Sequence, residues 1–212
     1  MFNRKFLTLA LALGVAGNAA AFGNDGFEEG DFRDFIVGPH SSLSTFITNS
    51  YEGFTAPEGS LFAHLSNAGT EDMSAYGGTI GSILSRHVDI TAGQTLSFKW
   101  AFLTLDSPAS PQYNDFSLFL DGHQTRLADI MGVGGDGHTG WNTFSWVADQ
   151  DFHGNVTWVV ANYGDNLGSS HLLLDDIRFG PASPVPEPAS YAMLLGGMAL
   201  LGGLARRRQR KG

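Results

Sequence analysis

The chain has 212 residues and no cysteine, which excludes disulfide bonds and thiol catalysis. Its formal net charge of −9 hides an uneven distribution, because seven of the 12 Lys and Arg residues lie within residues 1–21 or 206–212. Residues 22–188 carry all 21 acidic and only five basic residues, a formal charge of −16 that repels phosphate backbones and excludes nucleic acid as a partner.

The first 21 residues have the three parts of a secretory signal peptide. Arg4 and Lys5 precede an apolar run over residues 6–16, and small residues follow up to Ala21. This pattern predicts cleavage before Phe22, with the Sec translocon and signal peptidase as partners. The folded domain is therefore expected to begin at Phe22.

Residues 22–180 show apolar and polar side chains in alternation, the pattern of half-buried β-strands. The alternation is clear over four ranges and weaker over two more: 96–102, 116–120, 144–146, 156–160, then 61–65 and 80–83. Gly, Pro and Asp turn signals separate these runs, and no long amphipathic helix is evident. The spacing predicts roughly eight to ten strands in one all-β domain, an antiparallel jelly-roll β-sandwich.

The first and last strands of this domain carry unusual acidic patterns. Residues 24–32 read Asn-Asp-Gly-Phe-Glu-Glu-Gly-Asp-Phe, and residues 171–179 place two adjacent aspartates in an apolar strand. Both patterns resemble those of jelly-roll carbohydrate-binding modules, in which a structural calcium ion often lies where the first and last strands meet. The resemblance implies that Asn24, Glu28 and Asp175 are calcium ligands.

The two aspartates also have a purely structural interpretation. A carboxylate inside an apolar strand is costly to bury unless it is hydrogen-bonded, paired or bound to a metal. The inward one of Asp175 and Asp176 would then accept backbone N–H groups, or pair with Arg178 or Arg33. At the sequence level both interpretations stay open, so structural calcium is not a firm expectation.

Aromatic residues occupy two kinds of position in the predicted domain. Trp100, Trp146 and Trp158 lie in the middle of strands and are expected in the core. Tyr113 and Trp141 lie near turns, where an exposed ring could stack on a sugar ring. They are the candidate glycan contacts, and the alternative is that they close the edge of the core.

The sequence contains no motif for catalysis. The seven histidines are scattered without an HExxH spacing, and no Gly-x-Ser-x-Gly elbow is present. Residues 132–140 are Gly-rich but lack the Lys-Ser/Thr ending of a phosphate loop, so we predict a hairpin connection there. Asp136 and His138 within it are expected to be solvated, because zinc sites need three or four ligands. We predict no catalytic residue and no enzyme activity.

The C-terminus consists of three parts in a fixed order. Residues 181–188 are a linker stiffened by prolines, and residues 189–205 are an uncharged run at the short end of what spans a membrane as a helix. The linker contains Val185-Pro186-Glu187-Pro188. The tail, 206–212, contains the basic residues Arg206, Arg207, Arg208, Arg210 and Lys211. Basic tails stay in the cytoplasm, so we expect one inner-membrane span with the domain outside.

This order resembles the C-terminal signal of PEP-CTERM proteins, which exosortase recognises, processes and sorts to the bacterial cell surface or the exopolysaccharide matrix. The matching parts are Pro186-Glu187-Pro188, the apolar run and the basic cluster. The resemblance implies exosortase as a partner and an inner-membrane precursor of a surface or matrix protein. The alternative, an ordinary C-terminal anchor, gives the same topology.

Two functions remain for the exported domain. The first is a non-catalytic structural or adhesive role in the extracellular polysaccharide layer. The second is that of a specific carbohydrate-binding module on the same export route. Membrane targeting is common to both.

Overall fold

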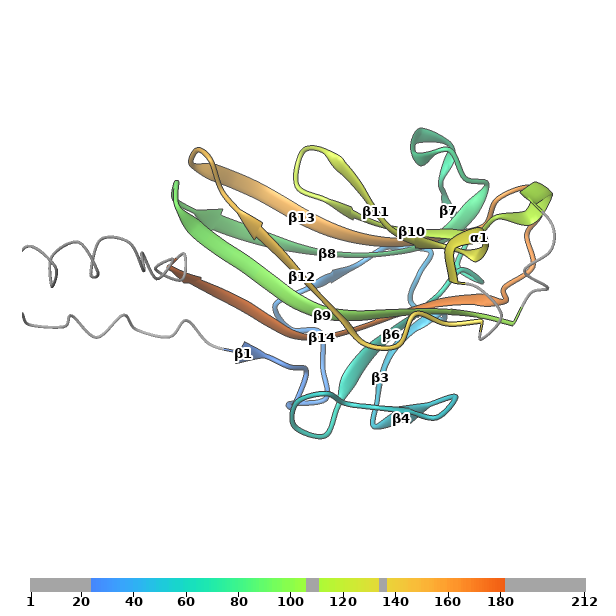
Figure 1. The fold of residues 1–212 in the computed structure, drawn as a ribbon, viewed down its shortest axis with the longest axis horizontal. Helices are drawn as coiled ribbons and strands as arrows, with labels where there is room; N and C mark the ends of the chain where they lie inside the picture. The colour runs from blue at the N-terminus through green and yellow to red at the C-terminus, as the bar shows by residue number, and fades with distance from the viewer. Residues whose placement is uncertain (1–23, 106–110, 134–136, 182–212) are drawn as a thin grey trace, which may run out of the picture. The chain divides into compact units, whose positions relative to one another are not determined.

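The computed structural model of the chain describes residues 24–105, 111–133 and 137–181 (Figure 1). These residues belong to the first of two compact units, Met1–Pro181, and none belongs to the second, Ala182–Gly212. The predicted signal peptide, sorting motif, membrane helix and basic tail therefore lie outside the described residues. Within the described part, no helix has the length and apolar character needed to span a membrane.

The strands form two sheets and a separate hairpin. Across the first sheet the order is β12 (Asn142–Val147), β9 (Gln94–Thr104), β14 (Ser170–Pro181), β6 (Phe62–Ser66) and β3 (Thr45–Thr48), with β1 (Asn24–Asp25) paired to β14. Across the second it is β11 (Gln124–Asp129), β10 (Phe116–Leu120), β13 (Phe152–Ala161), β8 (Ile80–Ile90) and β2 (Ile36–Val37), with β7 (Glu71–Asp72) paired to β8. The hairpin consists of β4 (Ser50–Tyr51) and β5 (Phe54–Thr55).

Helical structure is minor in the described part of the chain. It consists of the 3-10 turns η1 (Ser74–Tyr76) and η2 (Pro111–Tyr113) and the single α-helical turn α1 (Ile130–Val133). All strand pairings are antiparallel. The predicted fold class, an all-β antiparallel jelly-roll β-sandwich, is confirmed. The described residues form 14 strands rather than eight to ten, because five of them are two-residue strands that carry no periodic signal.

The core between the two sheets is built around aromatic rings. Phe98 on β9 contacts Phe119 on β10 and Trp158 on β13, with ring centroids 5.1 and 5.4 Å apart. Trp100 and Trp158 are buried as predicted, whereas Trp146 is partly buried and packs against the edge of this core. Full burial of each such side chain contributes about 2–3 kcal/mol, so the strands that supply them are held firmly.

The predicted hairpin at residues 132–140 is wrong. The strand before it, β11, belongs to the second sheet, and the strand after it, β12, belongs to the first. The chain therefore crosses from one sheet to the other here, and α1 occupies the start of the crossing. Glycine content indicated a turn but not which strands it joins.

The first sheet is buried on part of its outer face as well as on its core face. All five residues of β6 are buried, and Leu173 on β14 packs outward against Phe62, Ala101 and Leu103. The β4–β5 hairpin covers this outer cluster, and in Figure 1 it lies below β3 and β6, away from β8 and β13. Strands buried on both faces read as continuous apolar runs, which explains the weak alternation over residues 61–65.

Candidate functional site

A cleft of about 570 Å³ opens on the outer face of the first sheet, beside β3, β6 and β14, and we call it the outer-face cleft. Side chains alternate along these strands, so His64 and His171 face the cleft while Leu65 and Leu172 face the core. The turns before β3 and after β6 complete the walls. The cleft is therefore backed by rigid strands and lies opposite the sandwich core.

Two imidazoles form the floor of the outer-face cleft. Nε2 of His64 lies 3.1 Å from Nδ1 of His171, and the two residues are only 2% and 5% exposed. Burial lowers the pKa of His64 to about 3, with a further contribution from His171, and burial lowers the pKa of His171 to about 4. Both rings are therefore neutral at neutral pH, and one N–H is shared between them.

Two aromatic rings surround the imidazole pair. Phe46 on β3 stacks on His64 with centroids 4.3 Å apart and an interplanar angle of 27°, and Tyr51 on β4 lies 4.2 Å from the same ring. The Tyr51 hydroxyl is 3.1 Å from Nε2 of His171. Phe46 is 42% exposed and Leu43 on the rim is fully exposed. The cleft thus combines an open apolar wall with neutral groups that can form hydrogen bonds.

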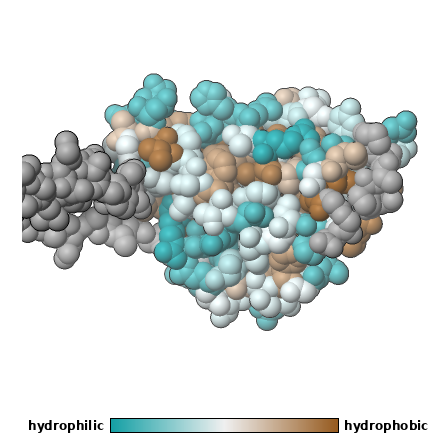
Figure 2. Space-filling view, in the orientation of Figure 1, coloured by the Kyte–Doolittle hydropathy of each residue, from teal (hydrophilic) through white to brown (hydrophobic). Residues whose placement is uncertain are grey.

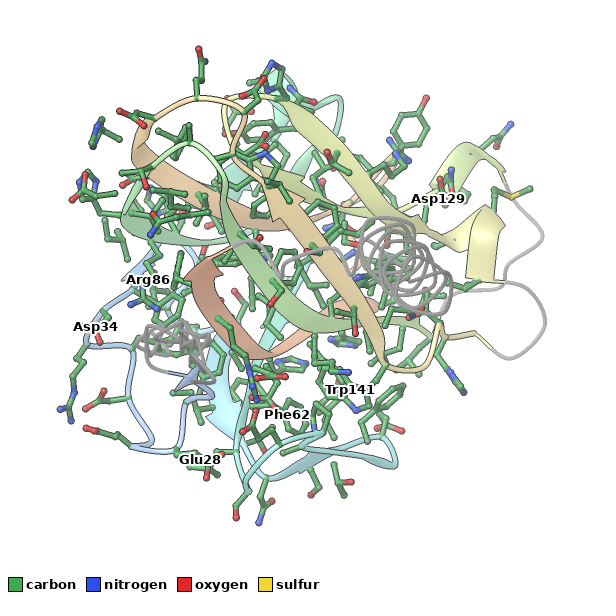
Figure 3. The ribbon with its side chains drawn as sticks, turned by 60° about the vertical axis from the view of Figure 1, so that its left-hand side comes forward. Glu28, Asp34, Phe62, Arg86, Asp129 and Trp141 are labelled. Atoms are coloured by element: carbon green, nitrogen blue, oxygen red, sulfur yellow. The ribbon has the colours of Figure 1, made fainter. Side chains whose placement is uncertain are left out.

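The β4–β5 hairpin is fixed in place by Trp141. Its indole Nε1–H donates to the carbonyl oxygen of Thr55 at 3.0 Å, and its ring packs edge-on against Phe54 and Phe62. Figure 3 shows Trp141 and Phe62 side by side. Trp141 was a candidate glycan contact, but it does not line the outer-face cleft and its N–H is already bonded.

Tyr113, the other candidate glycan contact, lies at the end of η2 and is 43% exposed. It does not line the outer-face cleft either. A role for Tyr113 or Trp141 in contacting glycan stays a prediction. Trp141 packs against the same outer cluster as Tyr51, but neither Trp141 nor Tyr113 lines the cleft.

The predicted calcium ligands lie near the junction of the first and last strands, where Asn24 on β1 pairs with Arg178 on β14. The Glu28 carboxylate accepts the backbone N–H groups of Ser60 and Leu61 at 2.9–3.0 Å. Asp175 is fully buried on the outer face of the first sheet, the same face as Leu173, whereas Asp176 is partly buried. The negative charge of Glu28 makes a small contribution that raises the pKa of the Asp175 carboxyl.

Backbone N–H groups already satisfy the Asp175 carboxylate. It accepts hydrogen bonds from the N–H of Asp176 at 2.7 Å and of Glu58 at 3.2 Å. Burial outweighs these bonds and raises the pKa of Asp175 to about 7. Among the described residues, no three His, Asp or Glu side chains gather in a group that could hold a metal ion. Calcium at this junction stays a prediction.

Sequence reasoning missed the outer-face cleft because its histidines are far apart in the chain. His64 and His171 meet only through the pairing of β6 with β14. A signal did exist, since His64 lies within a short apolar run and His171 directly precedes one, and a polar residue buried there needs a partner. The identity of that partner depends on strand order, which periodicity does not give.

The fold is a β-sandwich with a cleft on the outer face of one sheet. Residues 184–211 match the PEP-CTERM protein-sorting motif, which confirms the predicted resemblance of the C-terminus. The chain is therefore an exported, exosortase-targeted protein, made as a membrane-anchored precursor that later reaches the cell surface. No curated protein matches the chain in sequence.

Several solved structures have a similar fold. TmCBM61 in complex with β-1,4-galactotriose has 13% identity and a TM-score of 0.45, covering 74% of this chain and 94% of its own. The CBM22-1 xylan-binding domain from Paenibacillus barcinonensis has 10% identity and a TM-score of 0.42, covering 79% and 97%. The K2 cleaved adhesin domain of Lys-gingipain has 15% identity and a TM-score of 0.40, covering 74% and 96%. Likeness at this level does not identify a ligand.

Proposed function

We propose that the exported β-sandwich is a non-catalytic adhesive domain that binds carbohydrate in the outer-face cleft. The Sec translocon exports the chain and signal peptidase cleaves it before Phe22. Residues 189–205 hold the precursor in the inner membrane until exosortase acts near Pro186-Glu187-Pro188. Carbohydrate binding then attaches the mature protein to polysaccharide at the cell surface or in the matrix.

The observation that carries this proposal is the pairing of an exposed ring with neutral polar groups in one concave site. A pyranose presents a face of C–H groups and a rim of hydroxyls. The Phe46 ring can pack on such a face, and the Tyr51 hydroxyl can bond to the rim. The strands below fix both groups before the ligand arrives, which reduces the entropy cost of binding.

The lining of the outer-face cleft supports a binding role over a hydrolytic one. A glycosidase needs two carboxyl groups on opposite sides of the scissile bond. None of the described residues that line the cleft is Asp or Glu. Among the described residues, the hydroxyl that contacts the imidazole pair is the phenol of Tyr51, which is not the Ser hydroxyl of a Ser-His arrangement.

The test is a glycan array probed with the purified full chain and with variants of the cleft. Phe46→Ala removes the exposed ring and is expected to weaken binding by about five- to thirtyfold, since such contacts carry roughly 1–2 kcal/mol. Tyr51→Ala should have a similar effect.

Tyr113→Ala is the matched control. Tyr113 is 43% exposed and Phe46 is 42% exposed, but Tyr113 does not line the outer-face cleft. Binding should survive this change. If Tyr113→Ala abolishes binding while Phe46→Ala leaves it intact, the glycan site is at the Tyr113 turn and the cleft assignment is wrong.

A further inference from the structure

The outer-face cleft is free of charged side chains within a strongly acidic domain. Residues 22–188 have a formal charge of −16, yet none of the described residues that line the cleft is Asp, Glu, Lys or Arg. Figure 2 shows hydrophilic, intermediate and hydrophobic residues mixed over the visible face. A ligand therefore enters a neutral cleft through a field that repels anions.

The imidazole floor supplies no positive charge to the cleft. His64 and His171 are buried, and burial lowers the pKa of His64 to about 3 and that of His171 to about 4. Protonation of both rings would also place two cations side by side, with nitrogen atoms 3.1 Å apart. The floor can therefore donate or accept a hydrogen bond, but it does not neutralise an anion.

The basic side chains of the domain are engaged outside the cleft. Residues 22–180 contain only five, and none of them lines the cleft. Four have partners that would compete with any ligand: Arg33 with Glu29 and Asp31, Arg86 with Phe35 and Phe179, Arg126 with Asp129, and Arg178 with Glu58 and Asp176. The fifth, Lys99, lies on β9 opposite Asp175 of β14.

We propose that the outer-face cleft selects uncharged glycans and rejects glycans that carry carboxylates. A uronic acid in the cleft would lose water without gaining a cation, which is costly for a charged group. A neutral sugar of the same shape loses only hydroxyl hydration, which hydrogen bonds in the cleft replace. This inference rests on the proposed function, because it assumes that the cleft binds carbohydrate.

The experiment compares acidic polysaccharides with their carboxyl-reduced forms, which keep the same linkages and ring shapes. The full chain is titrated with both members of each pair at pH 8, above the ordinary titration range of histidine, because the exposed His40 also lines the cleft. We expect the reduced member to bind at least tenfold more tightly in every pair that binds.

Equal affinity for both members, or tighter binding of the acidic member, overturns the selectivity while leaving carbohydrate binding intact. Failure of every acidic, reduced and naturally neutral glycan to bind overturns the proposed function and the selectivity together. The two failures are therefore distinguishable.

A gain of function tests the same point within the cleft. Ser42 lines the cleft and is exposed, so Ser42→Arg places a cation on the rim. We expect this variant to bind the acidic member roughly fivefold more tightly and the reduced member nearly unchanged. Ser145→Arg on β12 is the matched control, since it adds the same charge outside the cleft. An equal gain in both variants would show that net charge, not the neutral cleft, excludes acidic glycans.

Discussion

The Tyr51 hydroxyl lies 3.1 Å from Nε2 of His171, although 120 residues separate them in the sequence. This contact joins the β4–β5 hairpin to the last strand of the first sheet. Burial, with a smaller contribution from Glu52, raises the pKa of Tyr51, so its hydroxyl stays protonated at neutral pH. The shape of the outer-face cleft therefore depends on the hairpin remaining against the sheet.

The Trp141→Phe variant should loosen this hairpin. The change keeps an aromatic ring against Phe54 and Phe62 but removes the Nε1–H that donates to Thr55. We expect a loss of about 1 kcal/mol in the free energy of unfolding. Hydrogen exchange at residues 50–55 should become faster, and glycan affinity should fall although Trp141 does not line the cleft. Trp146→Phe is the control, and equal exchange in both variants would contradict a clamping role.

The imidazole pair should reduce the stability of the domain in mild acid, whereas the Asp175 carboxyl, whose pKa is raised to about 7, acts in the opposite direction over the same range. The pKa values of His64 and His171 are about 3 and about 4 in the folded state, below the ordinary value near 6.5. Between these values the unfolded chain binds protons that the folded chain does not. Stability is therefore unaffected by these groups above pH 6.5 and falls as the pH decreases toward 4 and 3.

The expected loss by pH 5 is about 2 kcal/mol per ring, measured by urea unfolding at pH 5 and pH 7.5. A His64→Gln/His171→Gln double variant should lose this part of the pH dependence and keep the part due to other groups. If the double variant shows the same pH dependence as the original chain, the two rings are not held neutral by the fold.

Asp115→Asn should destabilise the domain strongly. The buried carboxylate accepts bonds from Asn67 Nδ2 at 2.7 Å, Ser170 Oγ at 2.8 Å and the Tyr163 N–H at 2.9 Å. An amide in its place turns an N–H₂ group toward one of these donors. We expect a loss of about 2–4 kcal/mol in urea unfolding. The exposed Asp149→Asn is the control, expected within about 0.5 kcal/mol of the original chain.

Adding calcium tests whether the junction of the first and last strands holds an ion or is purely structural. After chelation, adding calcium should raise the melting temperature if Glu28 and Asp175 hold the ion, because binding to the folded state alone adds stability. Glu28→Gln should remove this response and leave the chelated protein folded. If adding calcium does not change the melting temperature of the original chain, Glu28 and Asp175 do not hold a calcium ion.

Surface display should depend on the sorting motif. Replacing Pro186, Glu187 and Pro188 by alanines leaves the apolar run and basic tail intact, so the precursor should still reach the membrane. We expect loss of the displayed form in surface labelling, with the precursor kept in the inner-membrane fraction. Normal display of this variant would contradict sorting through these residues.

The β-strands were predictable because burial on one face leaves a period of two in the sequence. Phe98 and Trp158 were recognised in this way, and both lie in the core. The hairpin that covers the outer face was not predicted, since two-residue strands such as Ser50–Tyr51 leave no periodic pattern. Because the hairpin was not predicted, the burial of Leu173 on the face away from the core was not predicted either.

The sequence by itself determined the export signals, the fold class and the acidic character of the domain, because each depends on composition or on spacing between near neighbours. The tertiary structure decided which distant residues meet. His64 and His171 became a neutral pair because β6 pairs with β14, and Trp141 became a support for the hairpin because β12 lies across the same sheet. Which distant residues come into contact depends on the strand order. Long-range packing decides that order, and no local sequence pattern encodes it.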